Sequence, residues 1–216
     1  MTSHTPTAQL PILRESTNPP ALSGNPMPDR NDALALLHDW VEAEGLRKHM
    51  YAVEAAVRFY ARKMGADEDL WGLAGLLHDL DWEKHPDVHP MKGVEALEER
   101  GYPPEVVRAI LSHRPEYTGV EPSTDLERVL FACDEISGLI HAACLMRPTG
   151  IDDIKPKSVV KKLKDKAFAA GVDRDQVARG VELIGLERAE HIQNVIDGMR
   201  DVGEVLGIRG VDLQKK

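Results

Sequence analysis

The stretch that decides the fold is EDLWGLAGLLHDLDW, residues 68–82, because an apolar helical pattern in it runs directly into a His-Asp pair. Asp67, the residue before this stretch, is well placed to cap the first turn of the predicted helix. The apolar residues follow the spacing of one buried helix face: Leu70, Leu73, Ala74 and Leu77. The pattern therefore predicts that His78 and Asp79 lie where a buried helix ends.

From Pro28 onward the chain is predicted to be all-α, a compact helical bundle. Apolar residues recur at helical spacing, and no segment shows a sustained alternation of apolar and polar residues. Gly45 is predicted to end the first helix and Gly101 the fourth. The predicted helices span about residues 29–44, 47–64, 67–78, 90–101, 104–113, 124–146, 156–168 and 173–183, followed by a last helix that carries Ile192 to Leu206.

Composition and charge narrow the classes of partner. The formal net charge of −9 argues against long nucleic acids and anionic membranes, which attract basic surfaces. No apolar run approaches the length of a membrane span. A small phosphorylated substrate remains compatible, since it needs only a local cationic pocket, and a homo-oligomer stays open. Cys133 and Cys144 lie about three turns apart on one predicted helix, too far for a disulfide, which favours a reducing, cytoplasmic location.

Several ionisable side chains fall on predicted buried faces. His49 joins the apolar face of the helix over 47–64, and His113 shares the apolar side of the helix that starts near Pro104. Asp134 lies in an apolar stripe of the helix over 124–146, where a carboxylate is costly to bury unless it is paired or binds a metal. Imidazole and carboxylate groups together suit Mn, Fe, Co, Ni, Zn or Mg, and helical bundles build metal sites from facing helices.

Other histidines are interpreted as structural. The pair His38-Asp39 on the first helix is taken as a chance doublet at the surface or in helix packing. His85 lies in a polar loop, either exposed or flanking the pocket, and His141 is read as a core residue or as a neighbour of the metal ligands.

The order His49, His78-Asp79 within LAGLLHDLD, and Asp134 within FACDEISG resembles the HD superfamily of metal-dependent hydrolases. The resemblance covers about residues 47–144 and implies an HD-type helical bundle in which these four residues bind one metal ion.

A subset of that family binds a second ion through two further histidines, which His89 in HPMKG and His113 in AILSH match. The chain resembles most closely small single-domain bacterial HD proteins of the HDIG type. The usual HDIGK motif reads HDLDW here, so its lysine is absent.

The resemblance and composition together predict the domain layout. Residues 1–27, rich in Pro, Ser and Thr, are expected to be a disordered tail. Residues 28–216 are expected to form one HD-type domain, long enough for a sizeable core. The metal-binding core is placed at about 47–146 and a C-terminal helical extension at 147–210.

The resemblance implies hydrolysis of a phosphoester, on a nucleotide or other small phosphorylated molecule, by a metal-activated water. It implies one or two divalent ions, with Asp79 as the natural bridging ligand and Asp81 or Lys84 assisting proton transfer or binding phosphate. Two alternatives are a di-iron HD-type oxygenase and a non-catalytic ligand-sensing module.

The candidate phosphate-binding residues are Arg114, next to His113, and Lys157 or Lys161 from a lysine-rich helix. The simpler interpretation of these lysines is a solvated helix face.

Overall fold

The computed structural model describes residues 27–210, and in this part of the chain it contains ten α-helices, one short 3-10 helix and no strand beyond an isolated bridge between Gly150 and Arg209. The helices are α1 (Arg30–Trp40), α2 (Glu44–Met64), α3 (Glu68–Leu77), η1 (Pro86–Val88), α4 (Met91–Glu99), α5 (Pro104–Ser112), α6 (Pro115–Thr118), α7 (Asp125–Leu145), α8 (Pro156–Lys164), α9 (Arg174–Ile184) and α10 (Arg188–Asp201). The predicted all-α fold is confirmed. The predicted tail over 1–27 lies, apart from Met27, outside the described residues, so it stays a prediction.

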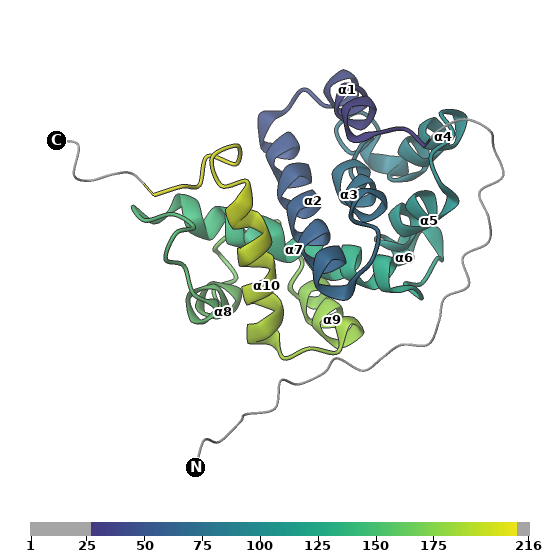
Figure 1. Cartoon of the computed structure of the whole chain (residues 1–216). Coiled ribbons are helices and arrows are strands. Elements are labelled where there is room, and N and C mark those ends of the chain that lie inside the picture. The colour runs from purple at the N-terminus through teal and green to yellow at the C-terminus, as the bar shows by residue number, and fades with distance from the viewer. Residues whose placement is uncertain (1–26, 211–216) are drawn as a thin grey trace, which may run out of the picture.

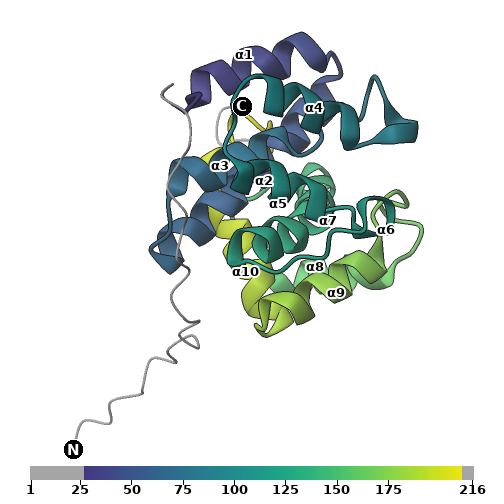
Figure 2. The same cartoon turned by 90° about the vertical axis from the view of Figure 1, so that its right-hand side faces the viewer.

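The two longest helices, α2 and α7, cross at the centre of the bundle (Figure 1). Helices α3 and α10 pack against α2, and α9 packs against α7. Helices α1 and α4 lie at one end of the molecule and α8 and α9 at the other (Figure 2). Both central helices bury most of their apolar residues, so side chains that point inward from either one meet in the middle of the fold.

Two glycines allow the helices around this centre to approach closely. A Cβ at Gly75 of α3 would lie 2.8 Å from the Cα of Glu54 in α2, and a Cβ at Gly180 of α9 would lie 2.7 Å from the Cα of Ala132 in α7. Such contacts are far shorter than carbon atoms tolerate, so a larger residue would push the helices apart. These close approaches set the positions of His78, just after α3, and of Asp134 in α7.

Gly45 does not end α1, as the sequence predicted, but lies in the first turn of α2. The chain leaves the helix at Val41, whose side chain is buried and whose backbone is extended. The Arg47 side chain binds the carbonyl of Val41 at 2.7 Å, and the Glu83 carboxylate accepts the N–H of Ala43 at 2.9 Å. Arg47 lies beyond the end of α1 and Glu83 lies 40 positions after Ala43, so the helix signals of the α1 segment reveal neither contact.

Helix α8 ends at Lys164, earlier than the predicted Phe168, because Arg174 holds the following segment in a loop. Its guanidinium donates to the carbonyls of Ala169 at 2.7 Å and of Val172 at 2.6 Å, and to that of Phe168. The short helix α6 was not predicted.

No helix in residues 27–210 is sufficiently long and apolar to cross a membrane. Cys133 and Cys144 are both free thiols, buried in α7, as predicted.

Candidate metal centre

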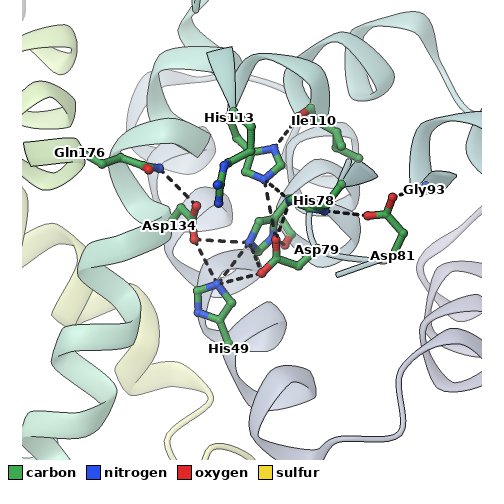
Figure 3. A network of polar contacts seen from close by, with 12 residues as sticks. His49, His78, Asp79, Asp81, Gly93, Ile110, His113, Asp134 and Gln176 are labelled. Carbon is green, nitrogen blue, oxygen red and sulfur yellow. Dashed lines mark hydrogen bonds and ion pairs between the residues drawn. The ribbon is translucent and has the colours of Figure 1, made fainter. Parts of the chain in front are cut away.

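Four side chains from three separate segments of the chain converge between α2, α3 and α7 (Figure 3). Nε2 of His49 lies 3.2 Å from Nε2 of His78, 3.0 Å from Oδ1 of Asp134 and 3.5 Å from Oδ2 of Asp79. Nε2 of His78 lies 3.5 Å from the same Asp79 oxygen and 3.4 Å from Oδ1 of Asp134. His49, His78 and Asp79 thus form a group that could hold a metal ion, and Oδ1 of Asp134 lies beside both histidine nitrogens of that group.

A second group forms on the other oxygen of Asp79. Nε2 of His89 lies 3.3 Å from Oδ1 of Asp79, and Nε2 of His113 lies 3.7 Å from it. The two histidine nitrogens are 3.0 Å apart. Asp79 therefore faces His49 and His78 with one oxygen and His89 and His113 with the other, which is the geometry of a bridging carboxylate.

In three of the imidazole rings, a hydrogen bond made by Nδ1 fixes which nitrogen carries the proton. Nδ1 of His78 donates to the carbonyl of Gly75 at 2.9 Å, and Nδ1 of His113 donates to the carbonyl of Ile110. Nδ1 of His89 donates to Oδ1 of Asp81 at 2.7 Å. When these imidazoles are neutral, as a metal ligand requires, the single N–H is on Nδ1 and each Nε2 atom presents a lone pair toward the cluster.

These residues fit a divalent cation. Tetrahedral sites with metal–ligand bonds of about 2.1 Å place neighbouring donor atoms roughly 3.4 Å apart. The distances from Nε2 of His49 and of His78 to each other and to the carboxylate oxygens of Asp79 and Asp134 run from 3.0 to 3.5 Å. The lone pairs of His89 and His113 face each other at 3.0 Å, which is unfavourable unless a cation or proton lies between them.

The charges of the cluster show how strongly it attracts a cation. Burial by itself lowers the pKa of His78, but the carboxylates of Asp79 and Asp134 outweigh burial and raise that pKa to about 9. Burial raises the pKa of Asp134, yet hydrogen bonds and charge from His49 and His78 hold it well below its usual value. Two carboxylates kept ionised inside a protein must be balanced by positive charge, from protons or from a metal ion.

A cavity of about 200 Å³ opens on this cluster. Its walls include three of the cluster residues, His49, Asp79 and Asp134. The other lining residues are Trp82, Arg114, Glu135, Gly138 and Val172.

Arg114 is held in place at this cavity. Its guanidinium lies over the rings of Trp82 and Tyr117, at 5.6 and 5.1 Å from their centroids, and pairs with Glu116 at 2.8 Å. The only predicted phosphate-binding residue in the cavity wall is therefore fixed by aromatic stacking.

Apart from Asp79 and Arg114, the predicted catalytic and substrate-binding residues do not line the cavity. Asp81 is fully buried, and its carboxylate accepts hydrogen bonds from Nδ1 of His89 and, at 2.9 Å, from the backbone N–H of Gly93. It therefore orients a histidine and cannot reach a phosphate. Lys84 donates to the carbonyl of Asp39 at 2.9 Å. Lys157 and Lys161 are exposed on α8 and do not line the cavity.

The histidines interpreted as structural also stay outside the cluster. Nε2 of His38 contacts the Tyr51 hydroxyl at 2.7 Å, and His38 and Asp39 are both exposed. His141 donates to the carbonyl of Leu206 at 3.1 Å, and His85 contacts the Trp40 ring.

Sequence reasoning missed two residues next to the centre. Glu135 follows Asp134 in α7 and lines the cavity, where burial and the neighbouring carboxylate raise its pKa to about 7. Nε2 of Gln176, in α9, lies 3.4 Å from Oδ2 of Asp134 (Figure 3). The sequence pattern that identifies the cluster residues includes neither Glu135 nor Gln176. The only available signal was that Glu135 directly follows the predicted ligand Asp134.

Comparison with known proteins agrees with this geometry. Residues 46–139 match the family model described as HD domain. The matched range contains every residue of the two groups, from His49 to Asp134. No curated protein and no solved structure matches the chain.

Proposed function

The chain carries an HD domain over residues 46–139 and so belongs to a superfamily of metal-dependent hydrolases, and on this premise we propose that it is a phosphohydrolase acting on a nucleotide or another small phosphorylated molecule. One observation carries the proposal: the carboxylate of Asp79 is shared between two histidine groups at a cavity that also holds Arg114. A paired cation site next to a fixed guanidinium suits a phosphoryl group, which is anionic and gains charge as it reacts.

In this proposal His49, His78, Asp79 and Asp134 would hold one divalent ion, and Asp79, His89 and His113 would hold a second. When bound, such ions supply Lewis-acid chemistry: they acidify water and neutralise charge on phosphoryl oxygens. The reaction breaks the bond from phosphorus to the ester oxygen and forms one to the oxygen of water. One proton of that water ends on the released alcohol and the other on the phosphate.

Arg114 binds the phosphoryl group in this scheme. Its stacking between Trp82 and Tyr117 keeps the guanidinium fixed, so little side-chain entropy is lost when a phosphate binds. Its partner Glu116 is exposed and pairs at the solvent side, where a bound phosphate can replace it. The net charge of −9 and the small cavity favour a small substrate over a long nucleic acid, and the two free thiols fit a reaction in the reducing cytoplasm.

The test is phosphate release from a panel of phosphorylated metabolites, nucleotides and diesters, by protein loaded separately with Mn, Fe, Co, Ni, Zn or Mg. We expect hydrolysis with at least one metal and its loss in Asp79→Ala. The matched control is Asp39→Ala, which removes the aspartate of the exposed His-Asp doublet and should leave activity unchanged. Full phosphatase activity in metal-loaded Asp79→Ala would refute the proposal.

The histidine-rich ligand set also suits iron, which is the observation that favours oxygenase chemistry as a second candidate. Anaerobically purified protein distinguishes the two. A stoichiometric iron content with substrate-dependent oxygen consumption, and no phosphate release, would replace the hydrolase by the oxygenase. Tight ligand binding without any turnover would instead indicate a sensing module.

A further inference from the structure

Glu135 lies in the cavity wall beside the first group of ligands. It follows Asp134 in α7, and its carboxylate is close enough to His49 for their charges to interact. Oε2 accepts the backbone N–H of Asp173 at 3.0 Å. Within residues 27–210 this is the only hydrogen bond that the carboxylate makes, so Oε1 remains available to accept a bond from a molecule in the cavity.

The partner of Glu135, Asp173, lies outside the matched HD range. Asp173 caps α9, its carboxylate accepting the N–H groups of Asp175 and Gln176 at 2.8 and 3.0 Å. Helix α9 is locked against α7 by the close approach at Gly180. The preceding residue, Val172, lines the cavity. Residues outside the matched HD range thus fix the direction of Glu135.

Arg114 and Glu135 border different parts of the cavity. Arg114 follows His113 and lies over the ring of Trp82, which contacts His89, so it stands at the second group. Glu135 stands at the first group, and the two side chains do not pair, since Arg114 binds Glu116 instead. The cavity therefore offers a cationic donor on one side and a carboxylate acceptor on the other.

We propose that Glu135 determines substrate specificity by accepting a hydrogen bond from the part of the substrate that is released. The substrate class is a small phosphate monoester that carries a hydroxyl or ammonium group some carbons away from the phosphate. This inference rests on the proposed phosphohydrolase function and names its substrate class. A cavity of about 200 Å³ is smaller than the roughly 300 Å³ at which drug-sized ligand pockets begin, which favours a compact ester.

The experiment compares alkyl phosphates with ω-hydroxyalkyl and ω-aminoalkyl phosphates of two to four carbons, using the full-length metal-loaded protein. A hydrogen bond to a charged acceptor is worth about ten- to a hundredfold. We expect kcat/KM to be at least about tenfold higher for the hydroxyl or amino ester than for the alkyl ester at the best chain length. p-Nitrophenyl phosphate serves as a reference ester without a donor group.

Glu135→Gln tests the residue. Its amide oxygen can still accept from the N–H of Asp173, while its NH₂ group then offers a donor to the cavity in place of an acceptor. We expect the ratio of kcat/KM for the hydroxyl or amino ester to that for the alkyl ester to fall to about one, while the bound metal content stays that of the wild type. Glu182→Gln, on the exposed side of α9, is the matched control and should keep the preference.

The outcomes separate this inference from the function on which it rests. Hydrolysis of all esters without preference in the wild-type protein overturns the role of Glu135 and leaves the phosphohydrolase in place. A preference that persists in folded Glu135→Gln also overturns it. No hydrolysis of any ester by metal-loaded protein overturns the proposed function and this inference together.

Discussion

The protein buries histidines in two places, and the two sites are built in opposite ways. At the candidate metal centre, Nε2 atoms and carboxylate oxygens converge with no N–H between His89 and His113. At the second site, between α2, α7 and α10, His191 has a partner for each nitrogen. Its Nε2–H donates to the carbonyl of Ala132 at 3.0 Å, and its Nδ1 accepts from the Tyr60 hydroxyl at 2.7 Å.

The second site continues as a complete hydrogen-bond chain. Asn194 donates to the oxygen of Tyr60 at 3.1 Å, and its own carbonyl oxygen accepts from Lys63 at 3.0 Å. Donors and acceptors alternate, so the group is satisfied without any ion. At the candidate metal centre, neutral imidazoles would leave only acceptors facing one another, so the site favours a bound proton or cation. The carboxylates there raise the pKa of His78 to about 9, while burial lowers the pKa of His191 to about 4.

The comparison gives a physical criterion for a ligand histidine. Burial alone does not distinguish the sites, since His78 and His191 are both almost fully buried. The distinction lies in whether the inward nitrogen has a partner of opposite character.

The largest effect is expected for His78→Ala, set against His191→Ala. Removing His78 deletes a donor atom from the first group, so divalent metal affinity should fall well beyond the roughly 10- to 100-fold typical of losing a residue that only supports a ligand. His191→Ala should bind metal as the wild type does. Isothermal titration calorimetry on both folded variants measures this, and equal losses of affinity would erase the contrast between the sites.

His191→Ala should instead destabilise the fold. It leaves the Tyr60 hydroxyl and the Ala132 carbonyl without partners in the core and opens a cavity. Together these effects cost about 3 kcal/mol of unfolding free energy. Urea denaturation of metal-free proteins checks this value. An unchanged midpoint would mean that the hydrogen-bond chain adds nothing to stability.

The lowered pKa of His191 predicts that the free energy of unfolding decreases at acid pH. Its pKa is about 4 in the folded protein and about 6.5 when unfolded, so between these values the unfolded chain binds more protons. The contribution of neutral His191 to the free energy of unfolding is therefore complete above pH 6.5. It decreases as the pH drops toward 4, by up to about 3 kcal/mol. His191→Ala should show a shallower acid limb in pH-dependent denaturation, whereas an identical slope in both proteins would assign the limb to other groups.

The sequence predicted which side chains converge at the candidate metal centre better than it predicted the surroundings of that centre. His49, His78, Asp79, His89, His113 and Asp134 converge as expected, because helical periodicity and the resemblance to HD proteins both mark inward positions. Phosphate contacts from Lys84, Lys157 and Lys161 are not supported, since their positions depend on how separate helices pack. The end of α8 was missed for a related reason: it is set by Arg174, a residue ten positions further along the chain.

A substitution at Asp81 should lower metal affinity less than the loss of a ligand does, because Asp81 orients a ligand histidine and does not itself face the metal position. Asp81→Asn keeps the side-chain shape but weakens the acceptor for Nδ1 of His89. We expect metal affinity at the second group to fall about tenfold, within the range for such supporting residues. Stoichiometry separates the two groups, because one ion should still bind with wild-type affinity. Loss of both ions at once would show that the groups are not independent.

The smallest effect is expected for Gln176, which reaches the centre from α9, outside the matched HD range. Its contact with Oδ2 of Asp134 is long, at 3.4 Å, so it orients that carboxylate only weakly. Gln176→Ala should lower metal affinity by about two- to fivefold, below the usual range for supporting residues, and leave the unfolding midpoint of the metal-free protein unchanged. Gln176→Glu should be worse than Gln176→Ala, because it places a second carboxylate beside Asp134 without a proton to share. Equal affinities in wild type and both variants would show that α9 acts on the site through Glu135 and Val172 alone.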